Sequence, residues 1–233
     1  TAVLIDGAYC LRCFRNTFPD RNHGDADTVA GTAFALAVEH VRRAKRHKDA
    51  LYRIFFYDCP PIEKKMHLPV SKRSIDFSKT PAAIFRKKLH KELLRQRKLS
   101  LRLGHLSDHV DWELRPDALQ RLRCGDLRWE EIADEHFQLN VKQKAVDMKI
   151  GLDIAALAYG KRIDQIVLIA GDADFVPAAK LARREGIDFI LNPMGRSIPP
   201  GLFEHIDGLH SVKLSALPEA PTAQGTIDSS EST

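Results

Sequence analysis

Two aspartates stand one residue apart in the motif GDADF at residues 171–175. Asp172 and Asp174 directly follow an apolar run that reads IVLIA. Alternate residues of an extended turn can point the same way, which would bring the two carboxylates close together. Because like charges repel, such a pair needs a proton, a basic partner or a cation. Carboxylate oxygens are ligands that suit Mg²⁺ and Mn²⁺. The alternative reading is structural, with Asp172 as a turn residue and Asp174 as the cap of the helix that follows.

Further aspartates occupy comparable places in the sequence. Asp6 ends the apolar run AVLI, and Asp147 lies near the start of the helical pattern 143–160. Asp153 follows on the same pattern, about 120° around the helix from Asp147. This angle favours an i,i+4 pair of Asp153 with Lys149 over a place in the same ligand set.

Strand patterns alternate with amphipathic helix patterns along the chain. We expect strands at 2–7, 52–58, 100–106, 166–170, 187–191 and 211–214, and helices at 28–47, 81–100, 115–125, 143–160 and 174–186. This alternation predicts βαβ units and an α/β fold with a mostly parallel sheet. Because ligands bind outside the carboxyl ends of such strands, the aspartates stand where this architecture builds its sites.

The positive charge of the chain is concentrated in one region. The net charge is +5, but residues 42–102 hold 19 Lys and Arg against 5 Asp and Glu, a local balance of +14. Such asymmetry favours a polyanion partner such as RNA, and the alternative is the solvated face of a helix. The candidate phosphate contacts lie in the basic helix pattern: Lys87, Lys88, Lys91 and Arg95. Bases could stack on Phe55, Phe56, Phe77 and Phe85, although such residues more often belong to the core.

Several classes of protein do not fit the sequence. No apolar run reaches the roughly 18 residues of a membrane helix, and the N-terminal stretch lacks the layout of a signal peptide. Cys10 and Cys13 form a CxxC without a second ligand pair, so free thiols are favoured over a zinc site. Free thiols indicate a reducing, cytoplasmic setting.

The motifs LIDG, QKAVDMKIGLDI and GDADF, in this order, resemble the NYN domain family, which is related to the PIN-like nucleases. The segments YRIFFYD and LARREGIDFIL fit the same family. The resemblance covers about 1–59 and 138–212. It implies a three-layer α/β/α, Rossmann-like (PIN-like) fold over 1–214, with 60–137 as a basic helical accessory insertion. Residues 215–233 contain no Lys or Arg and are expected to form a disordered tail.

The resemblance also implies metal-dependent ribonuclease chemistry with Mg²⁺ or Mn²⁺ as cofactor. It carries catalytic and metal-binding roles onto Asp6, Asp147, Asp172 and Asp174, with Asp153 as an additional candidate ligand. Two positions depart from the family pattern. Tyr9 stands where the first motif usually has asparagine, and Ala173 stands where serine is common between the last two aspartates.

Two other functions stay open at the level of sequence. The departures at Tyr9 and Ala173 suit a non-catalytic RNA-binding or regulatory module that keeps the fold. A phosphohydrolase for small phosphate esters is disfavoured, because the haloacid dehalogenase pattern DxDx[TV] is absent and the first strand ends in DGAY. The oligomeric state is open, and a homo-oligomer is compatible with the sequence. No membrane partner is expected.

Overall fold

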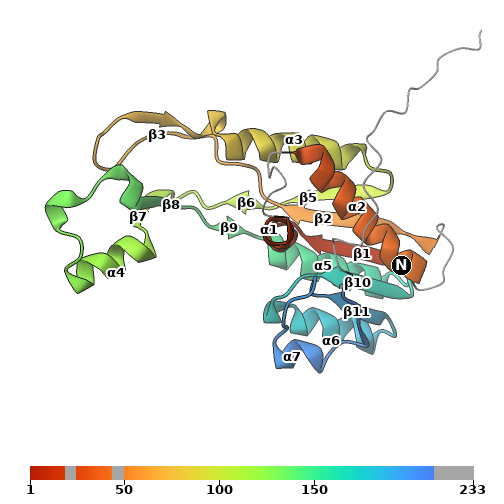
Figure 1. Cartoon of the computed structure of the whole chain (residues 1–233). Coiled ribbons are helices and arrows are strands. Elements are labelled where there is room, and N and C mark those ends of the chain that lie inside the picture. Colours follow the sequence, from red (N-terminus) through yellow and green to blue (C-terminus); the bar gives the residue numbers. More distant parts are fainter. Residues whose placement is uncertain (19–24, 44–49, 213–233) are drawn as a thin grey trace, which may run out of the picture.

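A computed structural model describes residues 1–18, 25–43 and 50–212, so the expected tail at 215–233 lies outside the described residues. Its centre is a six-stranded parallel sheet with the order β12-β11-β10-β1-β2-β5 (Figure 1). The strands are β1 (Ala2–Asp6), β2 (Arg53–Asp58), β5 (Leu99–Leu103), β10 (Gln165–Ile169), β11 (Asp188–Asn192) and β12 (Gly208–Leu209).

Helices cover both faces of this sheet and give three layers. One face carries α1 (Gly7–Thr17), α2 (Ala26–Arg43) and α3 (Pro81–Arg95), and the other carries α5 (Val146–Tyr159), α6 (Val176–Arg184) and α7 (Pro200–Phe203). The fold is therefore the expected α/β/α arrangement. None of the helices in the described ranges is long and apolar enough to cross a membrane.

Strand β1 shows how the sequence builds this core. Successive side chains of a strand point to opposite faces of the sheet. Val3 and Ile5 accordingly pack into the hydrophobic cluster under α1, α2 and α3, while Ala2 and Leu4 pack into the cluster under α5 and α6. A strand that is buried on both faces reads as a continuous apolar run, which is why AVLI lacks polar alternation.

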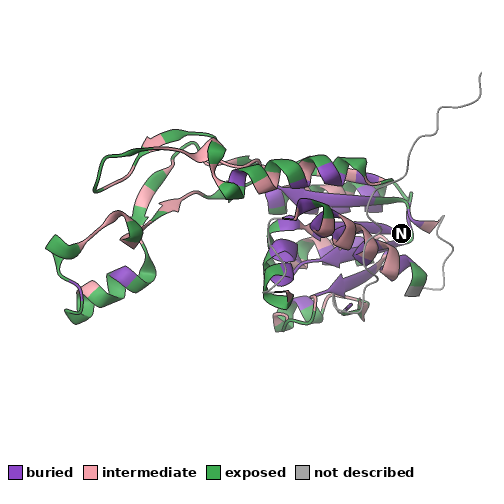
Figure 2. Ribbon diagram, turned by 45° about the horizontal axis from the view of Figure 1, so that its top comes forward, coloured by how far each residue is buried: buried purple, intermediate pink, exposed green. Residues whose placement is uncertain are grey.

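An arm extends from one edge of the layered body (Figure 1). It is built from short antiparallel pairs, and most of its surface is exposed or intermediate in burial (Figure 2). The pairs are β3 (Lys65–His67) with β4 (Ser74–Asp76), β6 (His105–Leu106) with β9 (Gln143–Lys144), and β7 (Asp111–Leu114) with β8 (Phe137–Asn140). The remaining helical elements are α4 (Pro116–Cys124), η2 (Phe77–Lys79), η3 (Trp129–Glu131), η4 (Asp134–His136) and, in the body, η5 (Ala173–Phe175).

Residues 60–137, expected as an accessory insertion, contribute to two parts of the structure. Helix α3 and strand β5 belong to the body, because α3 buries Leu89 and Leu93 in the core and β5 pairs with β2. The other residues of this segment form most of the arm.

Three local predictions need correction. The expected strand 100–106 is divided at Gly104, whose N–H donates to the carbonyl of Asp58 as the chain leaves the sheet for the arm. The edge strand is Gly208–Leu209, and the described part of 211–214 is not a strand. Helix α1 was not expected; Asp6 caps it by accepting a hydrogen bond from the Tyr9 N–H at 3.1 Å.

Replacing Gly7 by Ala tests the tight contact between α1 and β2. A Cβ at Gly7 would lie 2.4 Å from the backbone oxygen of Tyr57, so the variant must shift backbone and should lose roughly 1–3 kcal/mol in the free energy of unfolding. Gly151→Ala in α5 is the matched control. Its Cβ would meet nothing within 4 Å, and a mid-helix alanine should add roughly 0.5–1 kcal/mol. Urea unfolding measures both, and equal stability of the two variants would contradict the packing described.

Candidate active site

The candidate active site lies where the order of the strands reverses. From β1 the chain builds β2 and β5 on one side of the sheet, then returns to the other side of β1 with β10, β11 and β12. Open α/β sheets bind ligands in the crevice outside the carboxyl ends of the strands at such a switch point. Asp6 ends β1, and Asp172 follows β10, so both lie where such a crevice is expected, a place that we call the acidic crevice.

Asp6 is held by its own helix. Its Oδ1 accepts the Tyr9 N–H, which fixes the carboxylate at the N-terminus of α1. The pKa of Asp6 is raised from 3.8 to about 6, chiefly by burial and to a smaller extent by the charge of Asp147, while the hydrogen bond from the Tyr9 N–H lowers it.

Asp147 lies in the first turn of α5, directly after Ala145 and Val146. Ala145 has a φ of 66°, so the chain turns sharply from the arm into the helix. Burial raises the pKa of Asp147, and the neighbouring charges of Asp172 and Asp174 raise it as well. The carboxylates of the GDADF turn therefore raise the pKa of Asp147, and Asp147 in turn raises the pKa of Asp6.

The GDADF turn combines a capping role with its charge. Asp172 precedes η5, and its Oδ1 accepts the N–H of Asp174 at 3.1 Å. The structural interpretation, in which these aspartates serve a turn or a helix cap, is thus correct for Asp172. It is wrong for Asp174, which lies inside η5 and is not the cap of α6. The hydrogen bond fixes Asp172 and leaves both carboxylates exposed.

Asp153 is separate from this group. Its Oδ2 accepts hydrogen bonds from the hydroxyl of Tyr57 at 2.8 Å and from Nε of Arg102 at 3.2 Å. The expected pair with Lys149 is wrong, because the Lys149 ammonium donates to the carbonyl of Leu103. Asp153 thus has a tyrosine and an arginine as partners, which suits a structural role more than metal binding.

The four aspartates carry charge that no described side chain neutralises by an ion pair. Within 1–18, 25–43 and 50–212, no salt bridge involves Asp6, Asp147, Asp172 or Asp174; Arg12 exerts a weaker attraction on Asp6. The chemistry of this all-oxygen donor set fits a hard divalent cation. Among the described residues, however, no three His, Cys, Asp or Glu side chains are already arranged to hold a metal ion. Binding would therefore require the carboxylates to converge.

Tyr9, at the position where the resemblance led us to expect asparagine, connects neighbouring loops. Its hydroxyl donates to the carbonyl of Pro193 at 2.7 Å, and its ring lies against Gly171, where a Cβ would come within 2.5 Å of a ring carbon. Tyr9 thereby joins the ends of β1, β10 and β11. The second departure, Ala173, is exposed in η5.

A buried acid at the end of β2 was not among the predicted site residues. Asp58 is fully buried, with Nε2 of His90 at 2.7 Å from its Oδ2 and a nitrogen of Arg86 at 3.2 Å from its Oδ1. Both partners come from α3. The sequence signal was present, since Asp58 ends an apolar strand as Asp6 does, but its partners lie about 30 residues further along the chain.

The predicted RNA contacts on α3 differ in their surroundings. Lys87 pairs with Glu63, Lys88 with Asp27 and Arg95 with Glu92, each at 2.8 to 2.9 Å. Lys91 is exposed and has no ion-pair partner within the described residues. Part of the charge of the basic region is thus neutralised by its own neighbours.

The CxxC cysteines face the core. Cys10 and Cys13 are buried and form no disulfide. Burial raises the pKa of Cys10 to about 12, which disfavours the thiolate that zinc binds.

The parallel sheet, its two helical layers and the acidic crevice at the switch point define a PIN-like α/β protein. The chain belongs to the NYN domain family, whose model matches residues 1–197, including the arm. This family is generally nuclease-like. No significant match was found among curated proteins or among solved structures.

Replacing Asp6 by Asn should stabilise the protein at neutral pH. The pKa of Asp6 is about 6 in the folded chain against 3.8 ordinarily, so the folded state binds the proton more tightly and loses stability as the pH rises from about 4 to about 6. Asparagine keeps the capping oxygen without the charge. The gain should be roughly 1–3 kcal/mol above pH 7 and should vanish near pH 4.

Urea unfolding at both pH values measures this difference. Asp126→Asn, at an exposed carboxyl in the arm, is the matched control and should show no such pH dependence. A gain for Asp6→Asn that is as large at pH 4 as at neutral pH would contradict the assignment.

Proposed function

We propose that this NYN protein is a metal-dependent ribonuclease in which Asp6, Asp147, Asp172 and Asp174 hold Mg²⁺ or Mn²⁺. The supporting observation is the group of mutually repelling carboxylates, without an ion-pair partner in the described residues, at the switch point of the sheet. A divalent cation would relieve that repulsion. When bound, it would supply a Lewis acid and a water of lowered pKa for hydrolysis of a phosphodiester.

The protein's own residues would position this chemistry. The Tyr9 N–H orients Asp6, the Asp174 N–H orients Asp172, and Asp147 lies in the first turn of α5. The carboxylates would offset the charge of the cation. Cationic side chains would hold the phosphate backbone of RNA without reading its sequence. On α3 these are Lys87, Lys88, Lys91 and Arg95, of which Lys91 has no competing partner in the described residues.

A non-catalytic RNA-binding or regulatory module is the second candidate. It is favoured by the absence, among the described residues, of a ready-made metal-binding group, and by Tyr9 and Ala173 at positions where the family usually has polar groups. The two candidates share the RNA-binding surface and differ in whether phosphodiester bonds are broken.

Cleavage of RNA should depend on a divalent ion and on Asp172. Mixed cellular RNA incubated with the protein and Mg²⁺ or Mn²⁺ should yield discrete products, and EDTA should abolish them. Asp172→Asn should slow cleavage by roughly 100-fold or more, since loss of even a residue that supports a metal ligand costs about 10–100-fold. Asp126→Asn is the control with unchanged rate. Cleavage that persists in EDTA would contradict the metal-dependent mechanism, and RNA binding without any cleavage would favour the regulatory module.

Mg²⁺ or Mn²⁺ at millimolar concentration should raise the melting temperature of the protein. A ligand that binds only the folded state stabilises it by mass action, by about 2.7 kcal/mol at a concentration 100 times its Kd. The double variant Asp172→Asn, Asp174→Asn should show a much smaller shift relative to its own metal-free melting temperature. Thermal unfolding followed by circular dichroism measures both proteins. An equal shift in both would mean that the ions act elsewhere.

A further inference from the structure

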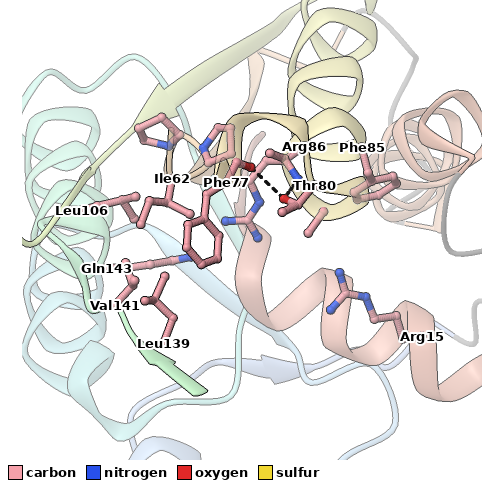
Figure 3. Close-up of a pocket in the computed structure, with 14 residues that line it drawn as sticks. Arg15, Ile62, Phe77, Thr80, Phe85, Arg86, Leu106, Leu139, Val141 and Gln143 are labelled. Carbon is pink, nitrogen blue, oxygen red and sulfur yellow. Dashed lines mark hydrogen bonds between the residues drawn. The ribbon is translucent and has the colours of Figure 1, made fainter. Parts of the chain in front are cut away.

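A hollow of about 480 Å³ lies between the body and the base of the arm (Figure 3). Its wall on the body side comes from α1 and α3, through residues such as Arg15 and Phe85, and its wall on the arm side comes from Leu106, Leu139 and Val141. Its volume falls within the range of small-ligand sites, which are mostly apolar with a few polar groups.

The four phenylalanines of the basic region fall into two groups. Phe55 and Phe56 are buried in the core of the sheet. Phe77 and Phe85 are only partly buried and line the hollow. The ring of Phe77 also packs against Trp112 of β7, with ring centroids 6.0 Å apart, which supports it from the arm. The mostly apolar wall of the hollow thus includes the ring of Phe77, which is supported by its packing against Trp112.

The polar groups of the hollow suit an anionic ligand with a polar edge. None of its fourteen lining residues is acidic. Arg15 is exposed and makes no ion pair within the described residues, whereas Arg86 is paired with buried Asp58. The side chain of Gln143 has no hydrogen-bond partner within the same residues and lies beside Phe77 in Figure 3. An amide can both donate to and accept from a base edge.

The hollow adjoins the acidic crevice through two elements. Arg15 lies on α1, about 14 Å along the helix axis from its cap Asp6. Arg86 reaches Asp58 at the end of β2, and Tyr57 of β2 is the register partner of Asp6. One nucleic acid strand that crosses the crevice can therefore also reach the hollow.

We infer that this hollow receives one unpaired nucleobase of the RNA, with the base on Phe77, its edge at Gln143 and the adjoining phosphate at Arg15. The inference deepens the proposed function and rests on it for the identity of the ligand as RNA. Stacked and paired bases in a duplex cannot enter such a hollow, whereas unpaired bases are commonly recognised by stacking on aromatic rings and by contacts at their edges. The substrate would then be single-stranded RNA or RNA with unpaired loops.

Binding measurements in EDTA test this inference without cleavage. Fluorescence anisotropy would compare the full chain and its variants on three ligands: a labelled 12-nucleotide single strand, the same strand in a full duplex, and the same backbone without bases. Phe77→Leu and, separately, Gln143→Ala should weaken single-strand binding, Phe77→Leu by roughly 5- to 100-fold, the range for loss of one stacked base. Both should bind the duplex and the base-free strand within about twofold of the wild type.

Control variants distinguish loss of the nucleobase contact from general changes in RNA affinity or in folding. Trp129→Leu, at an exposed aromatic on the arm, should leave all three affinities unchanged. Arg15→Gln should weaken binding of every ligand and reduce the salt slope by about 1. Melting temperatures confirm folding, and Gln143→Ala, at an exposed strand position, provides a second test if Phe77→Leu is unstable.

The inference is overturned if Phe77→Leu and Gln143→Ala bind single strands like the wild type, if they lose single strands and duplex equally, or if the wild type binds no single strand. These outcomes are distinct from failure of the ribonuclease proposal. If the protein binds single strands through Phe77 but never cleaves them, the nucleobase pocket is supported and the ribonuclease proposal is refuted. If the protein cleaves RNA with Mg²⁺ or Mn²⁺ but Phe77→Leu leaves single-strand affinity unchanged, the ribonuclease proposal is supported and the nucleobase pocket is refuted.

Discussion

Carboxylates at the switch point repel one another, and the packing around them must balance this repulsion. Burial and the charge of Asp147 disfavour the ionised form of Asp6, and burial and the charges of Asp172 and Asp174 disfavour the ionised form of Asp147. Such an arrangement is unfavourable by itself. It persists because the surrounding packing is tight: a Cβ at Gly7 or at Gly171 would collide with its neighbours. A sheet buried on both faces thus supplies the stability that the crevice lacks.

In the function that we propose, the layered body holds the acids and the arm helps to hold the RNA strand. The body fixes the acids through helix starts and strand ends, and Tyr9 joins the ends of β1 and β10, which carry three of them, to the end of β11. The arm adds little buried core but encloses a hollow against α3 and α1. A cation between the acids would act on the phosphate, while the arm and the basic side chains would hold the strand.

The parallel sheet and the place of the acids could be predicted from the sequence, because buried parallel strands read as apolar runs and Asp6 and Asp172 follow two of them directly. Helix α1 escaped prediction since it begins at Gly7 with no loop after β1, and glycine is a poor indicator of a helix. The partners of Asp58 and Asp153, and the short antiparallel pairs of the arm, depend on contacts between distant residues. Spacing along the chain carries no signal for such contacts.

The most direct measurement is anomalous X-ray diffraction from crystals of the protein soaked in Mn²⁺. We expect an anomalous difference peak between Asp6, Asp147, Asp172 and Asp174, with carboxylate oxygens at about 2.0–2.6 Å from the ion, the range for hard divalent cations. We also expect that these side chains move toward one another relative to the metal-free structure. A well-diffracting Mn²⁺-soaked crystal with no peak in this crevice, or with manganese bound only at other carboxylates, would contradict the claim that the crevice is a metal centre.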